Sequence, residues 1–370
     1  MSFLQRRQDP GTDVPAPADP AVCTMDETAN DWYGVRIASI FVILIGSLLG
    51  AVIPIYLVRY RNNERMGFSK LAFFISKYFG TGVIVSTAFM HLISPANEIL
   101  GMACLKPILG DYDWSMGIVL MTVMAMFFIE MIGAWYENRS NHEVGHGEAL
   151  AASKKSDEEH GSLNKETTDA GVQEAGAPSA GGMPSNLRGE DHLGHGRAHG
   201  EGDSHLAFAG KMTSIVILEA GVILHSIFIG LTLAVSSEFI ILFVVLVFHQ
   251  TFEGLGLGSR LATFEWPADK RRWTPWMFAV LYGLTTPIAI AAGLGVKDAL
   301  QAAPTTRYMV EGISNAISGG ILIYTGLVEL LAHEFIFNPE MDRASLRYKL
   351  FAFGCIAAGA GLMALLAKWA

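Results

Sequence analysis

The sequence predicts an all-α polytopic membrane protein with eight transmembrane helices. Hydrophobic residues make up 51% of the 370 residues. They are concentrated in blocks of about 20 residues, the length that crosses a hydrocarbon core of roughly 30 Å. Backbone groups inside lipid find no water to bond, so apolar segments of this length are expected to be helices. A soluble protein of this size would instead spread its apolar residues over short periodic patches.

Eight segments meet these conditions of length and composition. They lie at residues 35–58, 71–93, 114–135, 211–235, 239–262, 273–295, 308–332 and 349–369. The last segment is typical, because almost every residue from Leu350 to Leu366 is apolar or small. Residues 1–34 contain no apolar stretch of the signal-peptide kind, so the first span is expected to direct insertion by itself.

The charges in the connecting loops predict the orientation of the helices. Loops rich in Lys and Arg favour the cytoplasmic side of a membrane. The basic loops follow the first, fifth and seventh spans, so an even number of spans separates them. We therefore expect both termini outside the cell, with an extracellular segment 1–34 and a cytoplasmic loop 136–210.

The loop 136–210 separates the first three spans, in residues 35–135, from the fourth and fifth in 211–262 and the last three in 263–370. Its residues 140–205 are rich in Gly, Ala, Ser, Glu and His. Such a composition buries too little apolar surface to fold alone, so we expect a disordered loop. The chain carries a net charge of −9 and no basic patch, which argues against a nucleic-acid partner. Its apolar spans make the lipid bilayer the expected surroundings.

Ionisable residues inside the spans are the candidates for function. A charge at the centre of a membrane helix costs roughly 2.5–3.5 kcal/mol on insertion scales. The segment 211–262 holds the densest set, which comprises His225, Ser226, His249, Gln250 and Glu253. His249 and Glu253 are four residues apart and project from one helical face. Two imidazoles and a carboxylate form a mixed nitrogen and oxygen site that suits Zn²⁺ or Fe²⁺, and we predict that a divalent metal ion binds here.

Four further residues are weaker candidates for an entrance and an exit. His91 and Glu98 lie near the predicted outer end of the second span, and Glu329 and His333 lie near the inner end of the seventh. The alternative reading of all four is a polar helix end that faces headgroups or solvent.

The loop 136–210 carries two histidine patterns. His192, His195 and His199 are spaced for weak, flexible metal sensing, although a plain polar linker accounts for them equally well. The stretch from His142 to His146 matches the zinc-protease pattern H-E-x-x-H, but Gly145 breaks the helix that this chemistry needs.

These motifs together resemble the ZIP (Zrt/Irt-like protein) family of metal transporters, and most of all its fungal plasma-membrane zinc transporters. The stretches that carry the resemblance begin at Phe89, His225, His249 and Leu327, and it covers roughly residues 32–370. The resemblance implies a 3+2+3 arrangement of eight helices with outside termini, a metal site between the fourth and fifth helices, and elevator-like alternating access. Dimers are common in the family, so it also allows a homodimer.

Carried over by position, His225 and Glu253 match primary metal ligands of the family. Ser226, His249 and Gln250 match positions that line the same site. The chain departs from the bacterial pattern at Ile229, where that pattern has a glutamate. One principal ion site is therefore expected instead of a bridged pair.

The predicted function is import of Zn²⁺, or of Fe²⁺ or another divalent ion, into the cytoplasm. No phosphate-binding G-x-x-x-x-G-K-[ST] motif is present, so transport without ATP hydrolysis is expected, with zinc as cargo and not as a cofactor. The alternatives are a membrane-embedded zinc hydrolase or protease, a metal sensor that does not transport, and an exporter. Cys23 and Cys104 both fall outside in this topology, where a disulfide and two unpaired thiols remain equal alternatives.

Overall fold

The structure is a computed structural model. It describes residue 23 and residues 32–59, 67–133, 135, 204–264, 266, 272–336 and 338–369. The described part of the chain is helical and contains no strand. Predictions for the loop 136–210, including its disorder, concern residues that lie almost wholly outside these ranges.

Eight helices in these ranges are long and apolar enough to cross a membrane, which confirms the predicted fold class. They are α1 (Tyr33–Arg59), α2 (Gly67–Ser86) with η1 (Thr87–Ile93) and α3 (Ser94–Leu100), the unlabelled helix Trp114–Gly133, α6 (Ser204–Val235), α7 (Phe239–Thr263), α8 (Thr274–Gly295), α10 (Pro304–Tyr324) with η2 (Thr325–Ala332) and α11 (His333–Phe335), and α13 (Leu346–Leu366) with η3 (Ala367–Trp369). The short helices α4 (Lys106–Leu109), α9 (Lys297–Ala302) and α12 (Pro339–Arg343) lie between them.

The second and seventh spans are longer than the sequence indicated. Their predicted ends at residues 93 and 332 were wrong, because the helices continue to Leu100 and Phe335. Each contains a π-helical segment, η1 in the second span and η2 in the seventh. Such segments are rare and occur frequently at functional sites. Here they hold two of the predicted site residues, His91 and Glu329.

Large apolar side chains cover the outside of the bundle. Phe41, Ile45, Leu120, Met121 and Phe353 are all exposed. A soluble monomer rarely exposes an apolar patch of this extent to water. In a membrane the same side chains face lipid tails, so no apolar surface is exposed to water. The exposure of these side chains therefore agrees with an integral membrane protein that crosses the bilayer several times.

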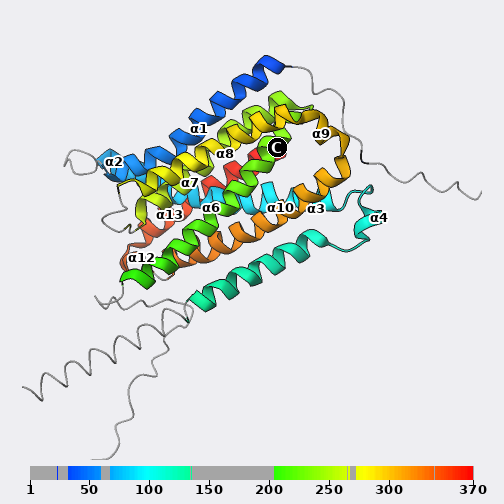
Figure 1. The fold of residues 1–370 in the computed structure, drawn as a ribbon. Helices are drawn as coiled ribbons and strands as arrows, with labels where there is room; N and C mark the ends of the chain where they lie inside the picture. Colours follow the sequence, from blue (N-terminus) through cyan, green and yellow to red (C-terminus); the bar gives the residue numbers. More distant parts are fainter. Residues whose placement is uncertain are drawn as a thin grey trace, which may run out of the picture.

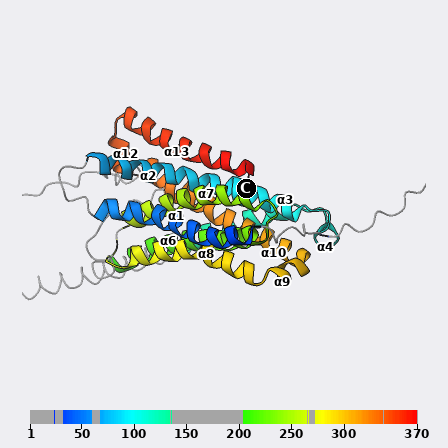
Figure 2. The ribbon, with the colours of Figure 1, turned by 90° about the horizontal axis from the view of Figure 1, so that it is seen from above.

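The helices lie side by side in one bundle (Figures 1 and 2), and their contacts divide them into two groups. The α7 group contains α1, α6, α7 and α8, in which α1 packs on α7 and α8, and α6 packs on α8. The α10 group contains α2 with η1 and α3, the helix Trp114–Gly133, α10 with η2 and α11, and α13. The groups meet where α2 crosses α7 and where α10 lies along α6. At the first crossing Gly80 and Gly256 bring the two backbones into direct contact, and a Cβ on either glycine would collide with the other helix.

A buried arginine holds together the end of the α7 group at which α1 begins and α6 ends. The Arg36 side chain on α1 is 1% exposed. It donates hydrogen bonds to the carbonyl oxygens of Leu233, Ala234 and Ser236, where α6 ends. The last carbonyls of a helix have no intrahelical donor, so these bonds satisfy groups that would otherwise lie unpaired in an apolar setting. The guanidinium also lies over the ring of Phe239, 4.5 Å from its centroid.

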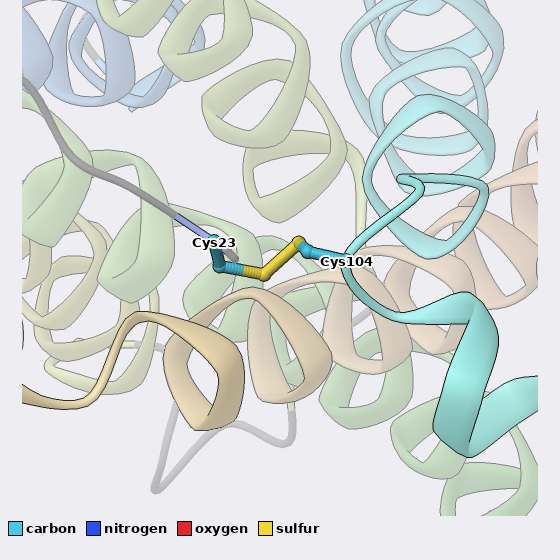
Figure 3. Close-up of a disulfide and its surroundings, with 2 residues drawn as sticks. All are labelled: Cys23 and Cys104. Atoms are coloured by element: carbon cyan, nitrogen blue, oxygen red, sulfur yellow. A yellow bond between two sulfur atoms is a disulfide. The ribbon is translucent and has the colours of Figure 1, made fainter. Parts of the chain in front are cut away.

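Cys23 and Cys104 form a disulfide, which settles the alternative that the sequence left open (Figure 3). Cys104 belongs to the connection between α3 and α4, and Cys23 precedes α1 by ten residues. The bond therefore ties the start of the α7 group to a loop of the α10 group. It also requires the start of α1 and the α3–α4 connection to lie on one side of the membrane.

Candidate metal site

The predicted metal-binding side chains come from α6 and α7, two antiparallel neighbours. The helices are joined by residues 236–238. His225 lies ten residues before the last residue of α6, and His249 lies ten residues after the first residue of α7. At 1.5 Å per residue both are about 15 Å from that end, which is half the thickness of a hydrocarbon core. A short connection of this kind places the two imidazoles at equal depth.

The three predicted principal ligands meet. Nε2 of His225 lies 3.2 Å from Nε2 of His249. Nε2 of His249 lies 3.7 Å from Oε2 of Glu253, one helical turn further along α7. One ligand atom from each of the three residues lies within 4.8 Å of the other two. Among the described residues this is the only group of three or more His, Cys, Asp or Glu side chains with that geometry.

All three side chains are buried, with exposed fractions of 2% for His225, 1% for His249 and 0% for Glu253. Both carboxylate oxygens of Glu253 and Nδ1 of each histidine lack a hydrogen-bond partner among the described residues. A buried polar atom without a partner is costly, and a carboxylate more so. A bound cation would satisfy the carboxylate, so the donor set fits a metal ion better than it fits a closed hydrogen-bond network.

Ser226 and Gln250 follow His225 and His249 directly in the sequence. Ser226 and Gln250 are fully buried, and the Ser226 hydroxyl and Oε1 of Gln250 have no hydrogen-bond partner in the described part of the chain. The amide of Gln250 donates to the Thr286 hydroxyl at 2.5 Å. The Tyr282 hydroxyl donates to the backbone carbonyl of Gln250 at 2.6 Å. Two residues of α8 thus orient Gln250 and leave its side-chain oxygen available to a ligand.

His91 lies deeper than the sequence indicated. It was expected near the outer end of its helix, but the helix continues beyond it, and its side chain is 5% exposed. Its ring packs edge-on against the ring of His249, with the centroids 4.8 Å apart. Nε2 of His91 lies 3.2 Å from the carbonyl oxygen of Met363 on α13. The α10 group therefore contributes an imidazole to the border of the site.

The other entrance and exit candidates lie apart from the three ligands. Glu98 is exposed in the last turns of α3, and His333 is exposed at the C-terminal end of the seventh span. Glu329 lies in η2, where one of its oxygens is 3.2 Å from an Arg260 guanidinium nitrogen. This ion pair joins the two helix groups near the C-terminal ends of α7 and of the seventh span. The sensing candidates His192, His195 and His199 and the H-E-x-x-H stretch lie outside the described residues.

Three polar residues near the site were not among the predicted ligands. Thr286 and Tyr282 gave no signal in the sequence, since a hydroxyl on an apolar helix is common. Glu219 is different, because it is a carboxylate in the middle of an apolar segment. It is 2% exposed, and neither of its oxygens has a hydrogen-bond partner among the described side chains and backbone. It lies six residues before His225, about 9 Å nearer the N-terminal end of α6.

Comparisons with known proteins identify the family of the chain. Residues 33–367 match the family model of the ZIP zinc transporters. The chain is 40% identical to zinc-regulated transporter 1 of Schizosaccharomyces pombe, over 91% of this chain and 85% of that protein. It is 39% identical to zinc-regulated transporter 1 of Saccharomyces cerevisiae (92% and 89%) and 35% identical to zinc-regulated transporter 2 of the same yeast (94% and 97%). No solved structure gives a significant match. With eight apolar helices around a buried His/Glu cluster and a family match along almost its whole length, the chain belongs to the ZIP zinc transporter family.

Proposed function

We propose that the protein imports Zn²⁺ across the plasma membrane into the cytoplasm through a site formed by His225, His249 and Glu253. The observation that carries this proposal is the meeting of these three side chains at mid-depth, with the Glu253 carboxylate buried and without a hydrogen-bond partner in the described chain. Family membership and the fungal zinc-regulated transporters support zinc as the cargo.

The nitrogen separation supports a shared ion. Zinc binds imidazole nitrogen at roughly 2.0–2.1 Å, so two nitrogens on one tetrahedral zinc are about 3.3 Å apart. The observed separation of 3.2 Å between the Nε2 atoms of His225 and His249 is close to this value. In the metal-free protein the same distance allows one ring to donate a hydrogen bond to the other, and zinc takes the place of that shared proton.

Ser226 and Gln250 supply oxygen atoms at the border of the site. Their free oxygens are buried, so they are suited to replace part of the hydration shell of an arriving ion. The set contains no thiolate, which favours passage over permanent retention. Fe²⁺ accepts the same nitrogen and oxygen ligands, so we propose Zn²⁺ as the main cargo and Fe²⁺ as a secondary one. With Ile229 where a bridging glutamate would lie, we propose one principal ion at a time.

The direction and the driving force follow from charge. The disulfide between Cys23 and Cys104 belongs in an oxidising compartment, which supports an extracellular N-terminus and agrees with the basic inner loops. An even number of spans then places the C-terminus outside and the loop 136–210 inside. An inward-moving divalent ion gains about 4.6 kcal/mol from an inside-negative potential of roughly 100 mV. This drive needs no ATP.

Zinc uptake into vesicles that contain the purified protein tests the proposal. We expect His225→Ala and Glu253→Gln to abolish most uptake, because each leaves the ion with two principal ligands. Ile227→Ala, on the more exposed side of α6, and Glu238→Gln, an exposed acid at the start of α7, are matched controls that should transport normally. Normal uptake by His225→Ala and Glu253→Gln would refute the site. Binding of zinc without uptake by the unmodified protein would favour a sensor.

A membrane-embedded hydrolase makes the opposite prediction. Its best feature is the H-E-x-x-H stretch, so replacing His142 and Glu143 would abolish a hydrolase. A transporter with its site between α6 and α7 should keep most of its uptake after the same change. The uptake direction in sealed vesicles separates import from export, and crosslinking in the membrane tests for the homodimer.

A further inference from the structure

The outer half of the bundle holds a cavity that the metal site does not use. Its volume is about 300 Å³, and it lies between α6, α9 and α10. Apolar side chains line most of it, and its polar lining residues are Thr232, Thr306, Arg307 and Glu311. One water occupies about 30 Å³ in the liquid, so the space corresponds to roughly ten waters and accommodates a small cation with its hydration shell.

Glu311 is the acidic group of this cavity. Its side chain belongs to the buried set, at 9% exposure for the residue. One carboxylate oxygen accepts a hydrogen bond from the Thr232 hydroxyl at 2.8 Å. The other lies 3.7 Å from Nε of Arg307, one helical turn nearer the outer end of α10. A buried carboxylate with a cationic neighbour at this distance is a group that a competing cation can approach and exchange with.

A polar stripe continues from Glu311 towards the metal site. Glu311, Asn315 and Ser318 are spaced at i, i+4 and i+7 and therefore share one face of α10. All three are buried, and the Ser318 hydroxyl has no hydrogen-bond partner in the described ranges. Seven residues of helix carry this stripe about 10 Å into the membrane.

The stripe ends at the depth of His225. α6 and α10 run antiparallel, as two contacts show: Thr232 bonds to Glu311, and a Cβ on Gly221 would meet the side chain of Leu322. Seven residues inward from the first contact lie Ser318 on α10 and His225 on α6. Four residues outward from the second contact lie the same two residues, so Ser318 is opposite His225. The neighbouring Gly319 packs against Leu92 and Ile93, the residues that follow His91. Ser318 thus lies at the level of three histidines.

We propose that this cavity, together with the polar stripe of α10 along its contact with α6, is the outer access path of the hydrated divalent cation. Glu311 is its recruiting carboxylate, Arg307 is the counter-charge that the arriving cation displaces, and the Ser318 hydroxyl is the last oxygen before His225. This inference rests on the proposed function, because it assigns a route to the site described above. The proposed path follows the boundary between the two helix groups, so a relative movement of the groups would open it below the cavity and close it again.

The kinetics of zinc uptake by charge variants test this assignment. Glu311→Gln keeps the shape of the side chain and its contact with Thr232 but removes the charge. We expect the KM for zinc to rise roughly tenfold or more, with kcat much less affected. Arg307→Gln should lower the KM, because it removes a cation that competes with zinc. If the pair of Glu311 and Arg307 were purely structural, the KM for zinc would change in the same direction in both variants. Asp298→Asn, an exposed acid on the adjacent α9, is the matched control and should leave the KM unchanged.

A thiol introduced into the cavity gives a second measurement. Val310→Cys in a Cys355→Ser background should react with a positively charged methanethiosulfonate reagent added from outside. The reaction should block uptake, and zinc should slow it. If the KM of Glu311→Gln is unchanged and zinc gives no protection, the path is refuted, while the loss of uptake in His225→Ala would still support the proposed function. If His225→Ala transports normally, the proposed function itself fails.

Discussion

The ring of His91 packs edge-on against the ring of His249, with the two centroids 4.8 Å apart. His91 belongs to the α10 group and His249 to the α7 group, so this contact crosses the boundary between them. His225, His249 and Glu253 all lie on the α7 side. A movement of one group past the other would therefore separate His91 from the three ligands while the ligands stay together. Alternating access of the elevator kind needs a site that moves as a unit in this way.

The first prediction concerns His91 as a positioning residue. Replacing His91 by alanine should raise the KM for zinc by roughly tenfold to a hundredfold, the range found when groups that support metal ligands are removed. The loss should be smaller than that of His225→Ala, because no principal ligand disappears. Ser94→Ala, an exposed position in the next turn of the same helix, is the control. An unchanged KM for His91→Ala would assign the ring to packing alone.

The second prediction concerns the disulfide and the orientation of the chain. In a Cys355→Ser background, Cys23 and Cys104 are the only cysteines, and they are bonded to each other. A membrane-impermeant maleimide applied to intact cells should label the protein only after a reducing agent has been added. Labelling without reduction would show free thiols. Labelling that also needs permeabilised cells would place the N-terminus inside and reverse the proposed topology.

The third prediction concerns the inner ion pair. Arg260 on α7 and Glu329 in η2 join the two groups near the C-terminal ends of α7 and of the seventh span, 3.2 Å apart. If Glu329 receives the outgoing ion, Glu329→Gln should lower kcat several-fold and change the KM little. Glu334→Gln is a matched control, because it breaks an ion pair with Lys77 that lies inside the α10 group. Equal effects of the two variants would indicate a general loss of stability and no role in release.

The number and order of the spans were predictable from the sequence. Lipid imposes one length and one apolar composition on every span, so each block leaves a strong local signal. The lengths of the second and seventh helices were not predictable in this way. Their last turns are more polar, as at Ser94, Glu98 and His333, and a hydropathy window ends before them. The π-helical segments also leave no period that a sequence reveals.

The three side chains that meet between α6 and α7 could be singled out in the sequence because ionisable groups are rare inside spans. The spacing of His249 and Glu253 on one helix, and the short connection between α6 and α7, were sufficient to bring His225 to them. The role of Thr286 was not predictable, because only the packing of α8 on α7 brings it to Gln250. Glu311 was not predictable for the same reason. Its spacing from Ser318 is visible in the sequence, but the partner helix is not.

Imidazoles from α6 and α7 are proposed to hold zinc together with the Glu253 carboxylate. X-ray absorption at the zinc edge of the purified, zinc-loaded protein reads these ligands out. We predict two imidazole nitrogens at about 2.0–2.1 Å with oxygen ligands beside them. In His225→Ala and in His249→Ala the imidazole signal should fall to one ring, and the affinity for zinc should fall with it. A spectrum that remains the same in both variants would rule out zinc binding by these imidazoles.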